Sequence, residues 1–552
     1  MKIASILDNF TYTCFKYEGN FLQLEASNWE ETLEDEKPDM LFIESAWNET
    51  FKKLFRKKSC GDTPAGDPVC WCKQHNIPTV FWNKEDPFHF DHFIEIAKKF
   101  DFIFTTDLDC IPRYQAIMEH NRVYLLPFAA QTKIHNPIHK DLDKIGDIAF
   151  AGTWYNLRPE RQNEMNLLLK PALKYGLHIY DRMYNSASNR NYIYPECYQP
   201  NIKGYLPYED MVNYYKKYNI FLNVNTVKTS PTMLSRRVME LLACGTNVIS
   251  NRSSAVEKMF PGIVMVSECE EDTEKYLTIL LKDKDLRDRL SLLGQREVFK
   301  NHTYRHRFNT ILSNVGFREE NNACPGVSII AVTNRTDALH LIITNFKNQN
   351  YINTELIVII NNNNINLEQW NEIMSNDKRI SAFQIDEKKT PGDCYNFAVS
   401  QVKYEFISFF DDKNLYAPNF IGDMVNAFDY TDAGIVGKYS YYTYIMGQGI
   451  LGIINPDMEN RYVDTFPTSA VMINKKVMDV VKFDTAAKNP FPTLFGDCIH
   501  KDIRLYSSDR FNFVNVFNSS MEDHVWQSEE LLNQCSNLTH VSVSSCQAYV
   551  AI

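Results

Sequence analysis

The sequence predicts an α/β protein built from several parallel sheets. Short apolar segments alternate with helical patterns along most of the chain, first as MKIASIL, DMLFIES, TVFWN and FDFIFTT, then as DIAFAGT, KYNIFLNV, NVISN and GIVMV. Strands that alternate with amphipathic segments are typical of parallel sheets covered by helices on both faces. We therefore expect two consecutive Rossmann-type domains, followed by a third α/β unit.

The domain boundaries follow from length and from changes in composition. At roughly 150 residues per domain, 552 residues correspond to about three or four domains. A charged helical region ends near residue 301, and the polar junction REENNACPG follows at 318–326. The third unit begins with the strands VSIIAVTNR, ELIVIINNNN and YEFISFFDD. We predict domains at 1–140, 141–317 and 318–552.

The composition is that of an ordinary globular protein, with 44% hydrophobic and 23% charged residues. A net charge of -11 argues against nucleic acid as a partner, because phosphate binding needs clustered cations. The sequence offers neither a signal peptide nor an apolar run long enough to span a bilayer. We expect a cytoplasmic protein, either free or peripheral to a membrane, whose 13 cysteines are reduced. Its oligomeric state stays open.

The segment TSPTMLSRRVMELLACGTNVIS predicts a helix of about 13 residues, with Ser230 as N-cap, Pro231 at the first helical position and Gly245 just past the end. A helix N-terminus attracts anions, and Lys228 adds a cation there. A diphosphate would fit this place.

Glu240 follows Thr232 by eight residues, which is roughly 12 Å along a helix axis. That is about the reach from a phosphate to a ribose, so the Glu240 carboxylate is a candidate acceptor for ribose hydroxyls.

A second cluster of polar residues lies in DIAFAGTWYNLRPERQNEM, after a predicted strand. Gly152 permits close backbone approach of a ligand, and Arg158 and Arg161 can clamp phosphate. The alternative for each arginine is a solvated helix face.

Acidic residues also end two strands of the first domain, as Glu44 in ESAW and as the run Lys84, Glu85 and Asp86 in WNKEDP. If they face a cleft, they can bind an acceptor or act as a base. The alternative is a set of turn-capping and ion-paired carboxylates.

The stretches LPYEDMVNYYKKYNIFLNVN and RRVMELLACGTNVIS resemble the nucleotide-sugar half of GT-B glycosyltransferases, specifically the CgeB-like, spore-maturation branch. KPDMLFIESAW, IPTVFWNKEDP, FDFIFTTD and FAGTWYNLRPER resemble its N-terminal part, so the likeness spans residues 1 to 315. It implies a catalytic Glu240 and donor-binding residues at Gly152, Arg158, Arg161, Lys228, Ser230, Thr232 and Arg237. Thr232 departs from the pattern, because retaining relatives often carry a glutamate there.

In the third unit, the stretch FISFFDDKN ends an apolar strand in Asp411 and Asp412. Carboxylates at such a place suit Mg²⁺ or Mn²⁺ bound against a diphosphate. Lys413 stands where a third acid would be expected. Its ammonium either takes over part of the cation's role or points outward and leaves the site one ligand short.

Residues 326 to 526 resemble the GT-A fold of family-two glycosyltransferases, on the motifs VSIIAVTNR, TPGDCYNFAVSQVKYEFISFFDD and LFGDCIHKDIRLYSSDRFNFV. The likeness implies Asp497 as the catalytic base of an inverting transfer, and Asp412 with His524 as ligands of Mn²⁺ or Mg²⁺. It assigns donor binding to Thr333, Asn334, Arg335, Asn361, Gly392, Asn396, Asp411 and Lys413. Asn361 and Asn362 replace the usual acidic pair.

Both resemblances imply a glycosyltransferase, a hexosyltransferase by type, that moves a sugar from a nucleotide-diphosphate donor, with UDP-sugar the first candidate. The acceptor would be a glycan, a surface polysaccharide or a protein. Three alternatives stay open: two active modules, one active module beside a binding module, and a scaffold that binds glycan or nucleotide without catalysis. The sugar, the acceptor and the linkage are not fixed by the sequence.

Overall fold

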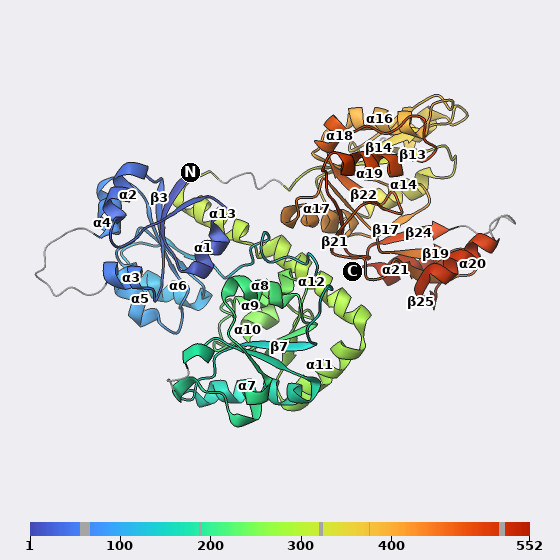
Figure 1. Ribbon diagram of the computed structural model, residues 1–552. Helices are drawn as coiled ribbons and strands as arrows, with labels where there is room; N and C mark the ends of the chain where they lie inside the picture. Colours follow the sequence, from blue (N-terminus) through green and yellow to red (C-terminus); the bar gives the residue numbers. More distant parts are fainter. Residues whose placement is uncertain (56–66, 187–189, 319–323, 375, 518–524) are drawn as a thin grey trace, which may run out of the picture. The chain divides into compact units, whose positions relative to one another are not determined.

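The computed structural model describes residues 1–55, 67–186, 190–318, 324–374, 376–517 and 525–552. The chain forms two compact units, Met1–Asn322 and Ala323–Ile552 (Figure 1). Each is an α/β unit, which confirms the predicted fold class.

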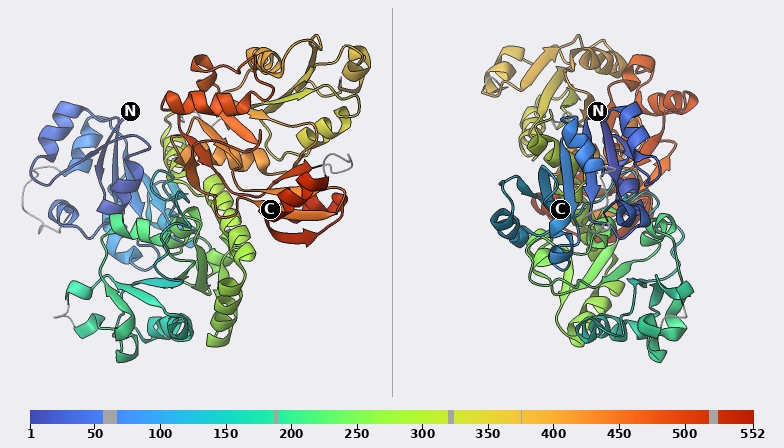
Figure 2. Two further views of the ribbon diagram at one scale, coloured as in Figure 1. Left: turned by 45° about the vertical axis from the view of Figure 1, so that its right-hand side comes forward. Right: turned by 90° about the vertical axis from the view of Figure 1, so that its left-hand side faces the viewer.

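The first domain of unit 1 is a parallel sheet of order β2-β1-β3-β4-β5-β6. Its strands are β1 (Lys2–Ile6), β2 (Asn20–Gln23), β3 (Met40–Glu44), β4 (Thr79–Asn83), β5 (Phe102–Thr105) and β6 (Val123–Leu125). Its helices are α1 (Asn9–Phe15), α2 (Trp29–Glu36), α3 (Glu49–Phe55), α4 (Pro68–Gln74), α5 (Phe90–Ala97) and α6 (Ile111–Ile117), and they flank the strands on both sides in the right-hand view of Figure 2. The strand order reverses between β1 and β3, where ligands of such sheets bind.

The second domain is a parallel sheet of order β12-β11-β10-β7-β8-β9. Its strands are β7 (Ile148–Gly152), β8 (His178–Asp181), β9 (Ile202–Gly204), β10 (Ile220–Asn223), β11 (Asn247–Asn251) and β12 (Met265–Ser267). Its main helices are α7 (Pro159–Ala172), α8 (Tyr208–Tyr215), α9 (Arg237–Ala243), α10 (Ser254–Met259), α11 (Glu270–Lys282) and α12 (Lys284–Asn301). Counted within the domain, this is the order of a dinucleotide-binding sheet, with its switch point between β7 and β10.

The last helix of unit 1, α13 (Tyr304–Val315), belongs by packing to the first domain. It lies beside α1 (Figure 1), and its apolar side chains Tyr304, Phe308 and Ile311 join the core that holds Ile3 and Phe15. The predicted range 141–317 therefore contains a helix that crosses back to the domain before it.

The helix predicted from Pro231 begins six residues later, because α9 starts at Arg237. The Ser230 hydroxyl does accept the Met233 N–H at 2.9 Å, but it closes a turn and does not cap a helix. The residues up to Arg236 form a loop whose polar groups bond elsewhere, so the prediction of the helix start was wrong. Its end was right: Gly245 lies just past α9 with φ +75°.

Unit 2 contains an eight-stranded sheet of order β15-β14-β13-β16-β22-β18-β23-β21. The parallel strands are β13 (Val327–Thr333), β14 (Thr354–Ile360), β15 (Ile380–Gln384) and β16 (Phe406–Phe409), and β22 (Val471–Asn474) pairs antiparallel to β16. The sheet continues through β18 (Ile435–Gly437), β23 (Leu505–Ser507) and β21 (Arg461–Val463). It is flanked by α14 (Leu339–Lys347), α15 (Leu367–Met374), α16 (Pro391–Gln401), α17 (Phe420–Tyr430), α18 (Val477–Val480) and α19 (Phe491–His500).

A smaller sheet of order β17-β24-β19-β20-β25 completes unit 2. Its strands are β17 (Leu415–Tyr416), β24 (Phe513–Phe517), β19 (Tyr441–Ile445), β20 (Ile450–Ile454) and β25 (Cys535–His540), with α20 (Val525–Gln534) and α21 (Val543–Val550) near the C-terminus. Since β17 follows the Asp411–Asp412 turn directly, this sheet fixes the far end of that turn. Within the described ranges, no helix has the length and apolar character needed to cross a bilayer.

Candidate functional site

A cavity of about 460 Å³ lies in unit 1, at the carboxyl ends of both sheets. Gly152 and Thr153 line it from the end of β7, and Asn225 lines it from the end of β10. Asp8 and Lys84 line it from the first domain. The cavity thus lies at the switch points of both sheets, and its volume is within the range of about 300–1,000 Å³ typical of small-molecule sites.

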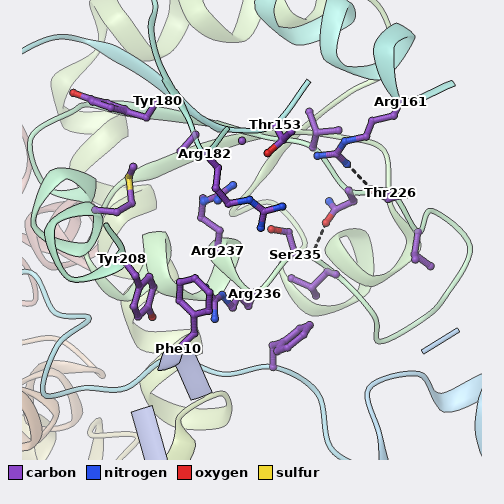
Figure 3. A pocket seen from close by; sticks show the side chains of 18 of the residues that line it. Phe10, Thr153, Arg161, Tyr180, Arg182, Tyr208, Thr226, Ser235, Arg236 and Arg237 are labelled. Carbon is purple, nitrogen blue, oxygen red and sulfur yellow. Dashed lines mark hydrogen bonds between the residues drawn. The ribbon is translucent and has the colours of Figure 1, made fainter. Parts of the chain in front are cut away.

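Arginines are the main charged residues in the wall of this cavity. Figure 3 shows the guanidinium groups of Arg161, Arg182, Arg236 and Arg237 around one space, and Arg158 also lines the wall. Burial lowers the pKa of Arg161, but an arginine stays charged at neutral pH. Guanidinium groups that converge in this way form a site for a multiply charged anion such as a diphosphate.

Three polar atoms in the same wall are buried and have no hydrogen-bond partner among the described residues: Thr153 Oγ1, Arg161 Nε and Arg237 Nε. Buried polar atoms in folded proteins nearly always have a partner, because leaving one unpaired costs about 1–3 kcal/mol. A polar ligand in the cavity would supply the missing hydrogen bonds.

Of the arginines in this wall, Arg158, Arg161 and Arg237 were predicted from the sequence as donor-binding residues, whereas Arg182 and Arg236 were not. Arg182 follows β8 directly, so its place at the carboxyl end of a parallel strand could have revealed it. Arg236 precedes α9, and its guanidinium lies 4.0 Å from the Phe10 ring centroid. It thus contacts the first domain as well as the cavity.

Glu240 lies behind the cavity wall. Its Oε1 accepts the Tyr208 hydroxyl at 2.8 Å, its Oε2 accepts the Tyr215 hydroxyl at 3.0 Å, and Arg236 Nε is 3.5 Å away. Burial would raise the pKa of Glu240, but Arg236 and these hydrogen bonds hold it below its usual value. Glu240 is buried and does not line the cavity, so the expected ribose contact stays a prediction. Glu240 orients Tyr208 and Arg236.

A buried histidine completes this cluster. His135 Nδ1 accepts the Gln131 N–H at 3.0 Å, and its Nε2 lies 3.0 Å from the Tyr208 hydroxyl oxygen. Because burial lowers the pKa of His135 to about 4, the ring is neutral at pH 7 and donates from Nε2. Tyr208 is therefore free to donate its own proton to Glu240.

The remaining predicted donor residues lie outside the cavity wall. Lys228 forms an ion pair with Glu164 at 2.7 Å. The Ser230 hydroxyl donates to Asp107 Oδ1 at 2.6 Å. Thr232 Oγ1 donates to the Thr106 carbonyl and accepts the Leu108 N–H, both at 2.9 Å. Ser230 and Thr232 thus fasten the loop of the second domain to the first.

The acidic strand ends of the first domain are ion-paired and also reach the cavity. Lys84 Nζ lies 3.0 Å from Glu44 Oε1 and contacts Asp8. Burial raises the pKa of Glu44 to about 7, against the opposite effect of Lys84. The ion pairs are therefore present, and Asp8, Lys84 and Glu85 also line the cavity. A role of this cluster in acceptor binding or as a base stays a prediction.

Asp86 lies apart from that cluster, in a buried hydrogen-bond network of its own. It accepts bonds from Asn83 Nδ2 at 2.8 Å, Thr105 Oγ1 at 2.7 Å and the Tyr114 hydroxyl at 3.0 Å. Burial raises the pKa of Asp86 to about 7.

In unit 2, the carboxyl ends of β13, β14 and β16 bring several predicted residues together. Thr333 Oγ1 donates to Asp412 Oδ2 at 2.6 Å and accepts the Arg335 N–H at 3.1 Å. The Asn361 N–H donates to the Thr333 carbonyl at 2.8 Å, and Asn334 accepts a bond from Asn362 Nδ2 at 2.8 Å. These residues form one edge, as predicted for a nucleotide-binding sheet.

The Asp411–Asp412 turn is held by a tyrosine that the sequence analysis missed. The Asp411 N–H donates to the Tyr416 hydroxyl at 2.9 Å, and the Tyr416 ring stacks on Phe410 with centroids 3.9 Å apart. Asp411 Oδ1 accepts the Lys413 N–H at 2.9 Å. Burial, with the like charge of Asp412, raises the pKa of Asp411. The Lys413 side chain is exposed.

Gly392 and Asn396 both pack against the segment 483–485. A Cβ at Gly392 would lie 2.2 Å from the Asp484 carbonyl oxygen. Asn396 donates to the Phe483 carbonyl at 2.8 Å and accepts the Phe483 N–H at 3.0 Å. The structure thus shows a packing role for both residues, and their contact with the donor stays a prediction.

The predicted base makes no direct contact with the acidic pair among the described residues of unit 2. Asp497 is exposed on α19, and in the described part of unit 2 no hydrogen bond or ion pair links it to Asp411 or Asp412. His524 lies outside the described residues. Its role stays a prediction.

The oxygen donors at this edge are a poor match for a divalent cation. Asp412 Oδ2 accepts from Thr333 and Asp411 Oδ1 accepts from Lys413, which leaves one oxygen of each carboxylate. The third position carries an ammonium in place of an acid. Across the described ranges there is no group of three or more His, Cys, Asp or Glu side chains placed to hold a metal ion.

Two family models match the chain, one in each unit. A model described as "Glycosyl transferase-like" matches residues 161–313, and one described as "Glycosyl transferase family 2" matches residues 328–472. The chain carries two glycosyltransferase domains in tandem. The family 2 match contains Thr333, Asp412 and Lys413 and ends before Asp497.

The glycosyltransferase-like half has a relative in spore protein CgeB of Bacillus subtilis (strain 168), which is 23% identical over 211 residues. The alignment covers 36% of this chain and 63% of that protein, so the chain spans less than two thirds of its relative. This similarity agrees with the predicted CgeB-like module.

Among solved structures, a glycosyltransferase from Rickettsia africae ESF-5 is similar to 57% of this chain and 89% of its own, at 12% identity and a TM-score of 0.38. S. aureus TarS 1-349 in complex with UDP-GlcNAc is similar over 36% of this chain and 61% of its own, at 14% identity and a TM-score of 0.30. The mannosyltransferase PcManGT from Pyrobaculum calidifontis, in complex with GDP-Man and Mn²⁺, is similar over 39% and 63%, at 14% identity and a TM-score of 0.30.

Proposed function

We propose that the protein transfers a sugar from a nucleotide-diphosphate donor to a hydroxyl of a glycan, surface-polysaccharide or protein acceptor. One observation carries the proposal for unit 1: five arginines and three buried polar atoms, unpartnered within the described residues, converge on one cavity at the switch points of two sheets. For unit 2, the proposal rests on the family 2 match and on the edge formed by Thr333, Asn361 and Asp412.

In unit 1, the donor diphosphate would lie against Arg161, Arg182 and Arg237. During transfer, the bond between the anomeric carbon and the diphosphate oxygen breaks, and a bond from that carbon to the acceptor oxygen forms. The electron pair of the breaking bond stays on the diphosphate, where the guanidinium groups stabilise the added charge. Their fixed positions in a partly dehydrated cavity make this stabilisation larger than it would be in water.

The acceptor would enter from the side of the first domain, where the cavity wall carries the acids Asp8 and Glu85 opposite the arginines. A carboxylate on this side can take the proton that the acceptor hydroxyl loses. Asp8 is held in place by Lys84 and by its bond from the Thr11 N–H at 2.8 Å. We assign Asp8 to this side of the reaction.

In unit 2, Thr333, Asn334 and Asn361 would contact the nucleotide, and Asp497 is proposed as the base. A Mn²⁺ or Mg²⁺ ion held by Asp412 and His524 would bind the donor phosphates and neutralise part of their charge.

One observation favours a second candidate, in which only unit 2 transfers sugar and unit 1 binds nucleotide-sugar or acceptor. The Thr232 hydroxyl is hydrogen-bonded to the backbone of Thr106 and Leu108. Retaining relatives often carry a glutamate at this position. Thr232 therefore supplies no carboxylate to the cavity. The scaffold hypothesis, without catalysis in either unit, is the outcome in which donors bind but are not consumed.

The experiment is a panel of UDP-, GDP- and dTDP-sugars, assayed for hydrolysis and transfer with the wild type, with Arg161→Met/Arg237→Met and with Asp412→Asn. Two active modules predict that each variant loses a different product. A loss confined to Asp412→Asn supports the second candidate. Binding of a donor without release of nucleotide diphosphate by any form supports the scaffold and contradicts the proposed transfer.

A cytoplasmic location, free or at a membrane surface, is part of the same proposal. It is supported by the described cysteines, which are free thiols, with Cys14, Cys72 and Cys244 buried in the cores of unit 1. Thiols of this kind are typical of a reducing compartment.

A further inference from the structure

We propose that unit 2 binds the diphosphate of its nucleotide without a divalent cation, and that the Lys413 ammonium occupies the place of that cation. The inference rests on the proposed function, since it assumes that the edge formed by β13, β14 and β16 binds a nucleotide. It departs from the metal predicted for Asp412 and His524.

The backbone geometry places Lys413 on the same turn as the two acids. Asp411, Asp412 and Lys413 follow the carboxyl end of β16 in succession. The turn is fixed at one end by the Tyr416 hydroxyl on the Asp411 N–H and at the other by the pairing of Leu415 with Val514. A residue at the third position therefore leaves the turn at a defined point beside the nucleotide edge.

An ammonium at that point can reach the place of a metal ion. A magnesium ion bound to an aspartate lies about 2.0–2.1 Å beyond a carboxylate oxygen, whereas lysine carries its charge at the end of a four-carbon stem. The two cations would thus lie at similar distances from the backbone. A divalent ion at the same turn would be repelled by the ammonium.

The carboxylates beside Lys413 are already used by the protein in part. Asp412 Oδ2 accepts the Thr333 hydroxyl at 2.6 Å, and Asp411 Oδ1 accepts the Lys413 N–H at 2.9 Å. These bonds orient the acids without a metal. Asp412 can then accept a hydroxyl of the nucleotide through its remaining oxygen.

A second cation stands at the edge of the neighbouring strand. Arg335 follows β13, and its guanidinium binds Asp337 through Nε at 3.0 Å and through Nη2 at 2.8 Å. The Asp337 side chain is 72% exposed, so this ion pair contributes little and can exchange for a phosphate. Lys413 and Arg335 together would neutralise a diphosphate at this edge.

The test uses the full chain with Arg161→Met and Arg237→Met, so that nucleotide binding reports on unit 2. UDP and GDP are titrated by calorimetry in EDTA and in Mn²⁺. We expect the same affinity, within about twofold, in both solutions. Adding Lys413→Met should lower the nucleotide affinity about tenfold or more both in EDTA and in Mn²⁺, because a charged hydrogen-bonding group is lost.

Two further variants distinguish loss of the Lys413 ammonium from a general effect of the substitution on the fold. Lys413→Asp restores an acid at the third position, so its nucleotide binding should be lost in EDTA and regained with Mn²⁺, with a signal of protein-bound Mn²⁺ in electron paramagnetic resonance. Lys476→Met is the matched control. Lys476 is exposed and follows β22, whose last residue, Asn474, pairs with Phe406 at the other end of β16 from the acidic pair. Lys476→Met should bind as the parent does.

A parent affinity that falls about tenfold in EDTA and returns with Mn²⁺ would overturn the inference, as would full binding by Lys413→Met. If the parent binds no nucleotide while the chain with intact Arg161 and Arg237 does, the inference fails and the proposed donor site of unit 1 stands. If no form binds, both fail.

Discussion

The Tyr208 hydroxyl donates a 2.8 Å hydrogen bond to Oε1 of Glu240, and Tyr208 lines the cavity of unit 1 whereas Glu240 does not. Glu240 thus supports Tyr208 from behind the wall. We therefore expect Glu240 to act by positioning Tyr208, and the ribose contact predicted from the sequence is the alternative.

This arrangement predicts the behaviour of Glu240→Gln. Removal of the charge leaves the partly exposed Arg236 without its charged partner at 3.5 Å, so we expect unit 1 to lose about 1–3 kcal/mol of stability and donor affinity to fall. The decisive readout is a 2′-deoxy or 3′-deoxy donor. When a ribose hydroxyl of the donor is removed, the affinity of the wild type and that of Glu240→Gln should fall by the same factor. A fall in the wild type alone would show that Glu240 contacts the ribose directly.

The arginine wall predicts a loss of binding without a loss of fold. Arg161→Met and Arg237→Met should each weaken nucleotide-diphosphate affinity about tenfold or more, since each removes a charged hydrogen bond. Arg305→Met, at a side chain 64% exposed on α13, is the control. If Arg161→Met, Arg237→Met and Arg305→Met bound the nucleotide diphosphate with equal affinity in a calorimetric titration, this cavity would not be the donor site.

Thr232 predicts a conformational effect. Thr232→Val leaves the Leu108 N–H and the Thr106 carbonyl without their partner, at a cost of about 1–3 kcal/mol. The arrangement in which the loop of the second domain is bonded to the first domain of unit 1 should become less populated. The KM for the donor should rise as a result. Thr232→Glu should be worse still, because the longer acid does not fit between the domains. A gain of activity in Thr232→Glu would show instead that the position serves catalysis; Thr32→Val, on α2, is the control for losing a threonine hydroxyl.

Asp86 predicts a pH dependence of stability. Burial raises its pKa in the folded state to about 7, against about 3.9 in an unfolded chain. Between these values the folded state binds more protons than the unfolded state, so stability is greatest at low pH and falls as pH rises through 7. From pH 6 to pH 8 the contribution of Asp86 should fall by about 1 kcal/mol.

Urea titrations at both pH values measure this difference. In Asp86→Asn, the fall in the free energy of unfolding between pH 6 and pH 8 should be smaller than in the wild type by about 1 kcal/mol. This difference does not depend on how the substitution changes stability at a single pH. Asp91→Asn, at a side chain 94% exposed, should leave the decline unchanged. An Asp86→Asn protein that declines as steeply as the wild type would mean that the carboxylate is ionised throughout.

The parts of the fold that could be predicted are those set by local pattern. Strand ends such as Gly152 and Thr333 were placed by the alternation of apolar and amphipathic segments, and sequence order then gave the carboxyl edges where Arg161 and Asp412 lie. The start of α9 was missed because Ser230 bonds to Asp107 across 123 residues. No local signal carries that contact.

The same limit applies to individual side chains. Gly392 and Asn396 have the residue types and spacing of donor-binding residues, yet the segment 483–485 packs against both. Arg182 has no motif around it and reaches the cavity because β8 lies beside β7. Which polar residue faces a ligand was decided by tertiary packing.

The central claim is that this chain holds two separate nucleotide-diphosphate sites. The most direct measurement is equilibrium binding of UDP, GDP and dTDP to the wild type, to Arg161→Met/Arg237→Met and to Arg335→Met/Lys413→Met. We predict two binding events in the wild type across the three nucleotides, one of which is lost in each double variant while the other persists. A single event that one double variant abolishes and the other leaves intact would contradict the claim.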